Sequence, residues 1–120
     1  IEDFDEVVRI NPDYAAVYNN RANAYYDLGQ REQALKDYDE AIRLDPSDPD
    51  IYINRGNVLF GMSQFERATK DYSEVIRINP DHVEAYHNRR LAYHRMGQYE
   101  ESNRDLARIT ELTASTNTEG

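Results

Sequence analysis

Apolar residues recur along this chain at the three- and four-residue spacing that places side chains on one face of a helix. Tyr18, Ala22, Tyr25 and Leu28 follow this spacing. Gly29 then offers a stop, since glycine accepts the left-handed conformation that ends many helices. No run alternates between apolar and polar residues with hairpin turns at its ends, so no strand is expected. The pattern predicts seven helices, near residues 1–10, 15–28, 31–44, 49–62, 65–78, 83–96 and 99–112.

The pattern itself repeats with a period of 34 residues. Residues at the same position of successive repeats form columns, among them Pro12/Pro46/Pro80, Tyr18/Tyr52/Tyr86, Asn20/Asn54/Asn88, Arg21/Arg55/Arg89 and Asp3/Asp37/Asp71/Asp105. Because these columns share one register, we expect three equivalent units at residues 15–48, 49–82 and 83–116, preceded over 1–14 by the second helix of a truncated unit. Residues 113–120 are small and polar, and a disordered tail is expected there.

Stacking of the units is expected because one helix pair buries too little apolar surface alone. Small residues such as Ala22 and Gly56 would let the paired helices approach each other closely. Asp13, Asp48 and Asp81 stand near the starts of the first helices of the units, where we expect them to act as N-caps.

These columns resemble the tetratricopeptide repeat (TPR) family over roughly residues 1–112. The period matches, and so do the family's characteristic positions, held here by Tyr18/Tyr52/Tyr86, Ala22/Gly56, Tyr25/Tyr93, Gly29/Gly97, Ala34/Ala68, Tyr38/Tyr72 and Pro46/Pro80. Ser63, Arg90 and Ala114 depart from the pattern, where a glycine, a small residue and a proline belong. The resemblance implies an all-α fold, a right-handed α-solenoid of antiparallel helix pairs known as the TPR superhelix.

Composition narrows the classes of partner. The 120 residues carry 23 acidic and 14 basic side chains, a net charge of −9, which argues against nucleic acid as a ligand. Cysteine is absent, which excludes disulfides and thiolate chemistry. No apolar run approaches the roughly 20 residues of a membrane helix, so no membrane insertion is expected. The compartment stays open, with the cytoplasm slightly favoured.

No catalytic constellation stands out in the sequence. The serines lie outside any nucleophile elbow and the glycines form no phosphate-binding loop, so the chain is predicted not to be an enzyme and to need no cofactor. His87 and His94 lie seven residues apart on one helix face, and Glu84 precedes them. These three residues are candidate metal ligands, but the interpretation favoured is that the histidines face solvent in a groove, and no metal is predicted.

The inner face of the first helices is the candidate binding surface that the resemblance implies. Asn20, Asn54 and Asn88 would form a ladder whose amides pair with the backbone of an extended peptide, because an amide both donates and accepts. The alternative is that these amides brace adjacent helices. The residues predicted to line the groove are Asn19, Asn20, Asn23, Tyr26, Asn54, Asn57, Phe60, His87, Asn88, Leu91, His94 and Arg95.

One known ligand class of the family is disfavoured by the residues themselves. Co-chaperone TPR domains hold the terminal carboxylate of heat-shock chaperones with two asparagines and three cations. Asn23 and Asn54 match the asparagine positions, but Asn19, Glu84 and Asn88 occupy the cation positions, and Glu84 would repel a carboxylate.

The functional prediction is therefore a protein–protein interaction scaffold that binds a peptide segment in the concave groove. Two alternatives stay open. The chain could be a non-catalytic targeting or regulatory domain of a larger enzyme, or it could be a structural element that forms homo-oligomers through exposed solenoid ends.

Arg90 is the residue that fits least well. It stands in the column of Ala22 and Gly56, opposite the second helix of its unit. A buried unpaired guanidinium is costly. We expect either that its side chain extends to solvent and pairs with Glu101 or Asp105, or that the last hairpin opens.

Overall fold

A computed structural model describes the backbone of residues 2–119 and the side chains of residues 3–114. In this part of the chain every regular element is a helix, as predicted. The helices are α1 (Glu2–Ile10), α2 (Ala15–Asp27), α3 (Arg31–Leu44), α4 (Pro49–Gly61), α5 (Phe65–Ile78), α6 (Val83–Arg95) and α7 (Tyr99–Glu119). All observed ends lie within one residue of the predicted ends except the end of α7.

Helix α7 continues to Glu119, so the predicted boundary at residue 112 is wrong and the expected tail over 113–120 is helical as far as that residue. The proline that ends the second helix in earlier units is replaced here by Ala114, which allows the helix to continue. Thr110 and Thr113 bond back within it, since their hydroxyls donate to the carbonyls of Leu106 and Ile109 at 3.0 and 2.9 Å.

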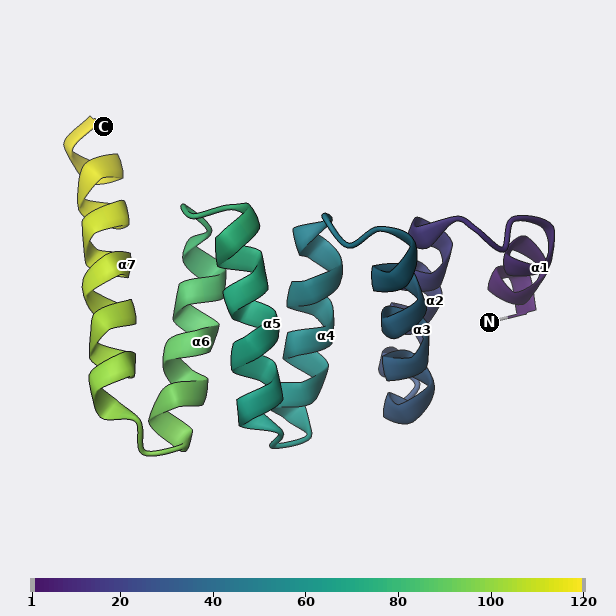
Figure 1. The fold of residues 1–120 in the computed structure, drawn as a ribbon, viewed down its shortest axis with the longest axis horizontal. Coiled ribbons are helices and arrows are strands. Elements are labelled where there is room, and N and C mark those ends of the chain that lie inside the picture. The colour runs from purple at the N-terminus through teal and green to yellow at the C-terminus, as the bar shows by residue number, and fades with distance from the viewer. Residues whose placement is uncertain (1, 120) are drawn as a thin grey trace.

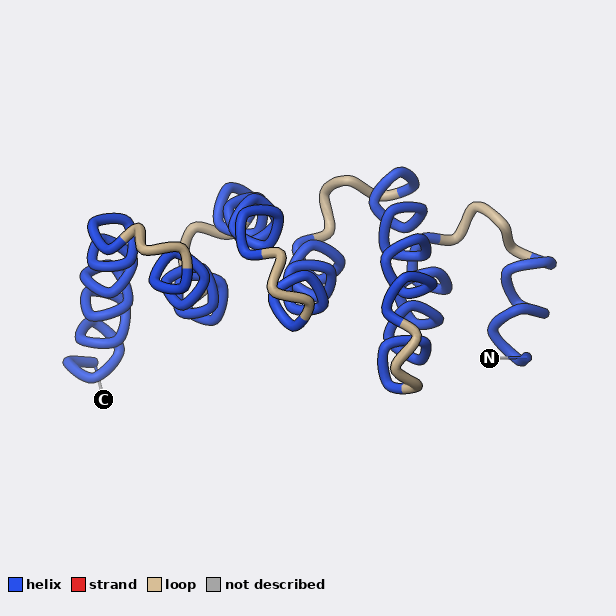
Figure 2. The backbone as a smooth tube through the Cα atoms, turned by 90° about the horizontal axis from the view of Figure 1, so that it is seen from below, coloured by secondary structure: helices blue, strands red, loops and turns tan. Residues whose placement is uncertain are grey.

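The helices stand side by side in chain order, with the two termini at opposite ends of the row (Figure 1). Helices α2 and α3, α4 and α5, and α6 and α7 form the three hairpins, and each hairpin packs on the next. The first helices of successive units also contact one another, α2 with α4 and α4 with α6, whereas the second helices do not within the described residues. The first helices therefore line the inner side of a body measuring 47 × 33 × 21 Å, and Figure 2 shows the row from a perpendicular direction.

The first and second hairpins are each closed around one large buried ring. Tyr38 and Tyr72 are almost completely buried in the first and second units. Gly56 packs on the second ring so closely that an added Cβ would lie 2.8 Å from Cε1 of Tyr72. The small-residue column therefore exists because the tyrosine of the second helix lies against the backbone of the first.

The turns within the hairpins and the N-caps of the first helices occupy the same repeat positions in all three units, although the residue types differ. Gly29 and Gly97 have φ values of +78° and +76°, and Ser63 takes the same turn position with φ +60°, in the left-handed region that favours glycine. The N-caps are Tyr14, Asp48 and His82. The expectation for Asp13 and Asp81 is wrong because both lie one residue before the capping column.

Arg90 fits the closed hairpin in an unexpected way. Helix α6 packs along α7, and Arg90 forms an ion pair with neither Glu101 nor Asp105, because Asp105 is occupied by Arg89. The Nε of Arg90 is buried without a hydrogen-bond partner in the described part of the chain. The space it needs is available since the column that holds tyrosine in the first two units holds Leu106 here, 46% exposed.

Candidate functional site

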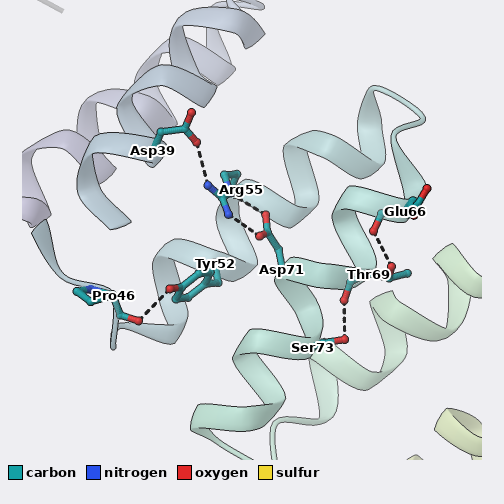
Figure 3. A network of polar contacts seen from close by, with 8 residues as sticks. All are labelled: Asp39, Pro46, Tyr52, Arg55, Glu66, Thr69, Asp71 and Ser73. Carbon is teal, nitrogen blue, oxygen red and sulfur yellow. Dashed lines mark hydrogen bonds and ion pairs between the residues drawn. The ribbon is translucent and has the colours of Figure 1, made fainter. Parts of the chain in front are cut away.

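The first helices are oriented by a ladder of arginine–aspartate pairs. In the second unit, Arg55 donates through Nε and NH2 to both oxygens of Asp71 at 2.8 and 2.7 Å, and through NH1 to Asp39 of the preceding unit at 2.9 Å (Figure 3). Asp71 is buried, and the two-pronged geometry suits an arginine and a carboxylate. The hydrogen bond to Asp71 raises the pKa of Arg55 further above its ordinary value. Each rung thus ties a first helix to its own unit and to the unit before.

In the first unit the arginine makes the same two carboxylate contacts as in the second unit, whereas in the third unit one of the two carboxylates is missing. Arg21 pairs with Asp37 at 2.7 Å and with Asp5 at 2.9 Å. Arg89 pairs with Asp105 at 2.9 and 2.6 Å, but its third contact is the hydroxyl of Ser73 at 3.1 Å. The third rung therefore lacks the cross-unit carboxylate.

Two groove asparagines are held from behind by the buried tyrosines. The hydroxyl of Tyr72 donates to Oδ1 of Asn57 at 2.7 Å, and the hydroxyl of Tyr38 donates to Oδ1 of Asn23. Burial raises the pKa of the Tyr72 phenol well above its usual range, and the neighbouring carboxylates of Asp71 and Glu84 raise it further. The phenols therefore stay neutral donors, and the asparagine side chains are fixed in one orientation.

The predicted asparagine ladder forms bonds between units. Nδ2 of Asn54 donates to Oδ1 of Asn19 at 3.2 Å, and Nδ2 of Asn88 donates to Oδ1 of Asn57 at 3.1 Å. The bracing role considered above therefore occurs at both positions. Each amide uses one donor in this way, so the rest of its hydrogen-bonding capacity remains for a ligand. Asn20, which is exposed, makes no such bond among the described residues.

A pocket of about 300 Å³ opens between the second and third units. Its lining combines polar amides with apolar and aromatic side chains, and it brings together four of the predicted groove residues with one that was not predicted: Asn57, Phe60, Asn88, Leu91 and Tyr72.

The remaining predicted residues of α6 do not line this pocket. His87, His94 and Arg95 are exposed, and the ring of His94 meets that of Tyr99 edge to face. The guanidinium of Arg95 lies 5.9 Å from the ring centre of Phe60. Among the described residues, no three histidine or acidic side chains lie together in a way that could hold a metal ion.

Sequence reasoning missed two features that carry the site. Tyr72 stood in the sequence only as a characteristic position of the family, although its hydroxyl bonds to the groove residue Asn57. The Arg55–Asp71 pairing was also missed, and both residues had been treated as separate columns. The available signal was that the two columns share the 34-residue period and lie 16 residues apart in all three units, as in Arg55 and Asp71.

Comparison with known proteins agrees with this architecture. Residues 22–63 match a TPR repeat model and residues 49–82 match a tetratricopeptide repeat model. The chain belongs to the tetratricopeptide repeat family, and its fold is the TPR superhelix. No curated protein matches it in sequence. None of the helices in the described residues is long and apolar enough to cross a membrane.

Solved structures show the same fold. A crystal structure of MamA superposes with a TM-score of 0.93 at 23% identity, over 98% of this chain and 68% of that one. In a second MamA structure, with a TM-score of 0.91 at 23% identity, the chain covers 98% of its own length and 64% of the other. The first TPR of Spaghetti (RPAP3), bound to the HSP90 peptide SRMEEVD, gives a TM-score of 0.77 at 28% identity over 82% of this chain and 78% of that one.

Proposed function

We propose that this chain is an interaction module that binds an extended peptide segment of a partner protein along the first helices α2, α4 and α6. The observation that carries the proposal is the pocket between the second and third units, where Asn57 and Asn88 stand beside Phe60 and Leu91. Amides beside apolar side chains match a peptide, which offers backbone groups and side chains together. Peptide binding by the Spaghetti repeat, which has the same fold, adds support.

The ligand is expected to differ from the chaperone tail bound by that relative. The three cation positions of the carboxylate clamp hold Asn19, Glu84 and Asn88. The negative charge of Glu84 would repel a terminal carboxylate. The equivalent positions of the other two units hold Ala16 and Asp50, so the column has no basic residue. A peptide with an internal binding segment therefore fits the groove better than one held by its C-terminus.

Selection of peptides from a random 12-residue phage library, followed by NMR titration of the isotope-labelled chain, tests the proposal. Peptides that bind should shift the side-chain amide signals of Asn20, Asn54 and Asn88. The peptide SRMEEVD serves as the comparison and should bind at least tenfold more weakly than the selected sequences. Failure of every selected peptide to shift groove signals would refute the proposal.

Two alanine variants separate binding from bracing. Asn20→Ala removes no bond within the described structure, so its melting temperature should not change while peptide affinity falls. Asn54→Ala also removes the bond to Asn19, and should cost about 0.5–1.5 kcal/mol of stability besides. If Asn20→Ala leaves affinity unchanged and Asn54→Ala lowers only stability, the amides are braces alone.

Self-association is a second candidate, favoured by apolar exposure on α1. Val7 is 38% and Ile10 is 60% exposed on that helix. Exposed apolar side chains favour contact with another chain. Light scattering at rising concentration should then show a mass above that of one chain, and Ile10→Ser should lower it. A constant monomer mass at millimolar concentration would count against this candidate.

A further inference from the structure

We infer that the pocket between the second and third units selects one medium-sized aliphatic side chain of the bound peptide, with a basic residue toward Glu84 and an acidic residue toward Arg95. This inference rests on the proposed function and adds the chemical class of the ligand.

The aliphatic preference follows from a difference between the two junctions of the solenoid. The pocket has Phe60 and Leu91 in its wall, together with the ring of Tyr72. At the same repeat positions of the junction between the first and second units stand Tyr26, Asn57 and Tyr38. The first junction therefore presents a phenol and an amide where the second presents a phenyl ring and an isobutyl group. Burial of apolar surface would therefore stabilise a bound aliphatic side chain only at the second junction.

The amides beside the pocket are oriented by bonds inside the protein. Oδ1 of Asn57 accepts from both Tyr72, at 2.7 Å, and Asn88, at 3.1 Å. Its Nδ2 therefore remains as the donor available to a ligand. Asn88 uses Nδ2 in this bond, so its Oδ1 remains as the acceptor. A donor and an acceptor side by side complement the carbonyl and the N–H of an extended peptide.

Charges at the two ends of α6 indicate which peptide residues should flank the aliphatic side chain. Glu84 stands in the first turn and Arg95 at the last residue. Eleven residues of helix separate them by about 16 Å. A peptide that crosses α6 after α2 and α4 therefore has Glu84 on one side and Arg95 on the other, and alternate side chains of an extended chain point to opposite sides. Arg95 lies over the ring of Phe60 in the pocket. Glu84 and Arg95 are both exposed, and neither forms an ion pair among the described residues. Both charges are therefore available to a ligand of mixed charge.

The experiment compares peptides selected from the random 12-residue library on the wild-type chain. Synthetic copies are measured by isothermal titration calorimetry against wild type, Leu91→Asn and Phe60→Tyr. These two substitutions place at the second junction the residues of the first. Leu28→Asn is the matched control, because it makes the same change at a leucine that is 61% exposed and does not line the pocket. Thermal melts verify that each variant folds, and Phe60→Tyr keeps the test valid if Leu91→Asn does not.

Selected peptides should share a Leu, Ile or Met. Replacing that residue by Ser should lower affinity about tenfold or more for wild type, and less than threefold for Leu91→Asn. Arg95→Glu should weaken binding of the same peptides about threefold or more, and Leu28→Asn should leave it unchanged. If peptides bind the groove without an aliphatic preference, or bind Leu91→Asn and Phe60→Tyr as tightly as wild type, the inference is overturned while the proposed function stands. If no peptide binds, both fail.

Discussion

The second and third units share a backbone but differ in one connected set of side chains. The second unit combines Gly56, Asn57 and Tyr72, with the ring packed on the glycine and the hydroxyl bonded to the amide. The third unit holds Arg90, Leu91 and Leu106 at the same three positions. The replacements occur together because a large ring requires a small neighbour and a hydroxyl requires an acceptor.

This difference teaches that a repeat unit can exchange one self-consistent set of contacts for another. The polar set directs an amide into the groove, and the apolar set gives the neighbouring pocket its aliphatic wall. The exchange leaves one defect, since the Nε of Arg90 is buried without a partner among the described residues.

The largest expected effect concerns the ladder. Asp105→Ala should cost about 3–5 kcal/mol, because it leaves the half-buried Arg89 with only the hydroxyl of Ser73. Asp71→Ala should cost less, since Arg55 keeps Asp39. Urea unfolding followed by circular dichroism measures both. Equal losses would show that the cross-unit carboxylate contributes nothing.

Asp39→Ala is the control for this pair of variants. The side chain of Asp39 is 59% exposed, against 6% for Asp71, so removing it should cost no more than about 1 kcal/mol.

Placing the arginine of the third unit at the equivalent position of the second unit should lower the free energy of unfolding by about 3 kcal/mol or more. Gly56→Arg places a long side chain where even a Cβ would lie 2.8 Å from the ring of Tyr72. Gly56→Ala is the matched control. Its Cβ meets the same ring, so it should cost about 1 kcal/mol, less than Gly56→Arg, because the Ala22–Tyr38 pair of the first unit shows that a Cβ at this position can be accommodated. A thermal melt of Gly56→Arg close to that of wild type would contradict the packing argument.

The reverse exchange should show coupling between two positions. Leu106→Tyr alone should destabilise the third unit, because the new ring meets Arg90. Together with Arg90→Gly, the same change should cost about 1–3 kcal/mol less than the single effects predict. A double-mutant cycle in urea measures the coupling, and strict additivity would show that these side chains do not compete for space.

Alkaline pH should affect the units unequally. Burial raises the pKa of Tyr38 and Tyr72 above the ordinary value near 10. The contribution of these two neutral phenols to the free energy of unfolding is therefore complete below about pH 10. It is lost as pH rises further, by up to about 1.4 kcal/mol per pH unit for each ring. The third unit has Leu106 at this position. Burial also raises the pKa of Tyr52, so Tyr72→Phe should reduce the slope of stability against pH above 10 without abolishing it, and an unchanged slope would contradict the assignment.

The smallest effect expected is a gain. Ser73→Asp restores the carboxylate that the first and second rungs have, facing Arg89. It should raise stability by about 0.5–1 kcal/mol, the range for partly exposed ion pairs. The gain should shrink in high salt, and Ser73→Asn, which has the same shape without the charge, should not show it.

Much of the fold was predictable because the repeat supplies redundant evidence. A boundary suggested weakly in one unit is suggested again 34 residues later, so the first six helices were placed within one residue. The end of α7 was predicted wrongly because Ala114 stands where Pro46 and Pro80 mark this boundary in the earlier units. The N-cap of α6 was predicted wrongly for a different reason. Asp81 was expected there because aspartate is a common N-cap, but the cap is the next residue, His82.

The site was predicted less completely than the fold. The positions of Asn57, Asn88 and Leu91 on the inner face followed from helical spacing, but the orientation of each amide did not. That orientation depends on Tyr72, whose hydroxyl crosses from the second helix of the unit to the first. A contact of this kind depends on how deeply the ring lies between the helices, which periodicity alone does not specify.

The unequal rungs of the ladder also bear on how the molecule would respond to force. Two of the three cross-unit links join an arginine to a carboxylate, at Asp5 and Asp39, and the third joins Arg89 to a neutral hydroxyl. A solenoid pulled along its axis behaves as a spring whose coils are held by such links. The link between the second and third units is the one without a carboxylate, so its resistance to force should not weaken with salt, whereas that of the links at Asp5 and Asp39 should.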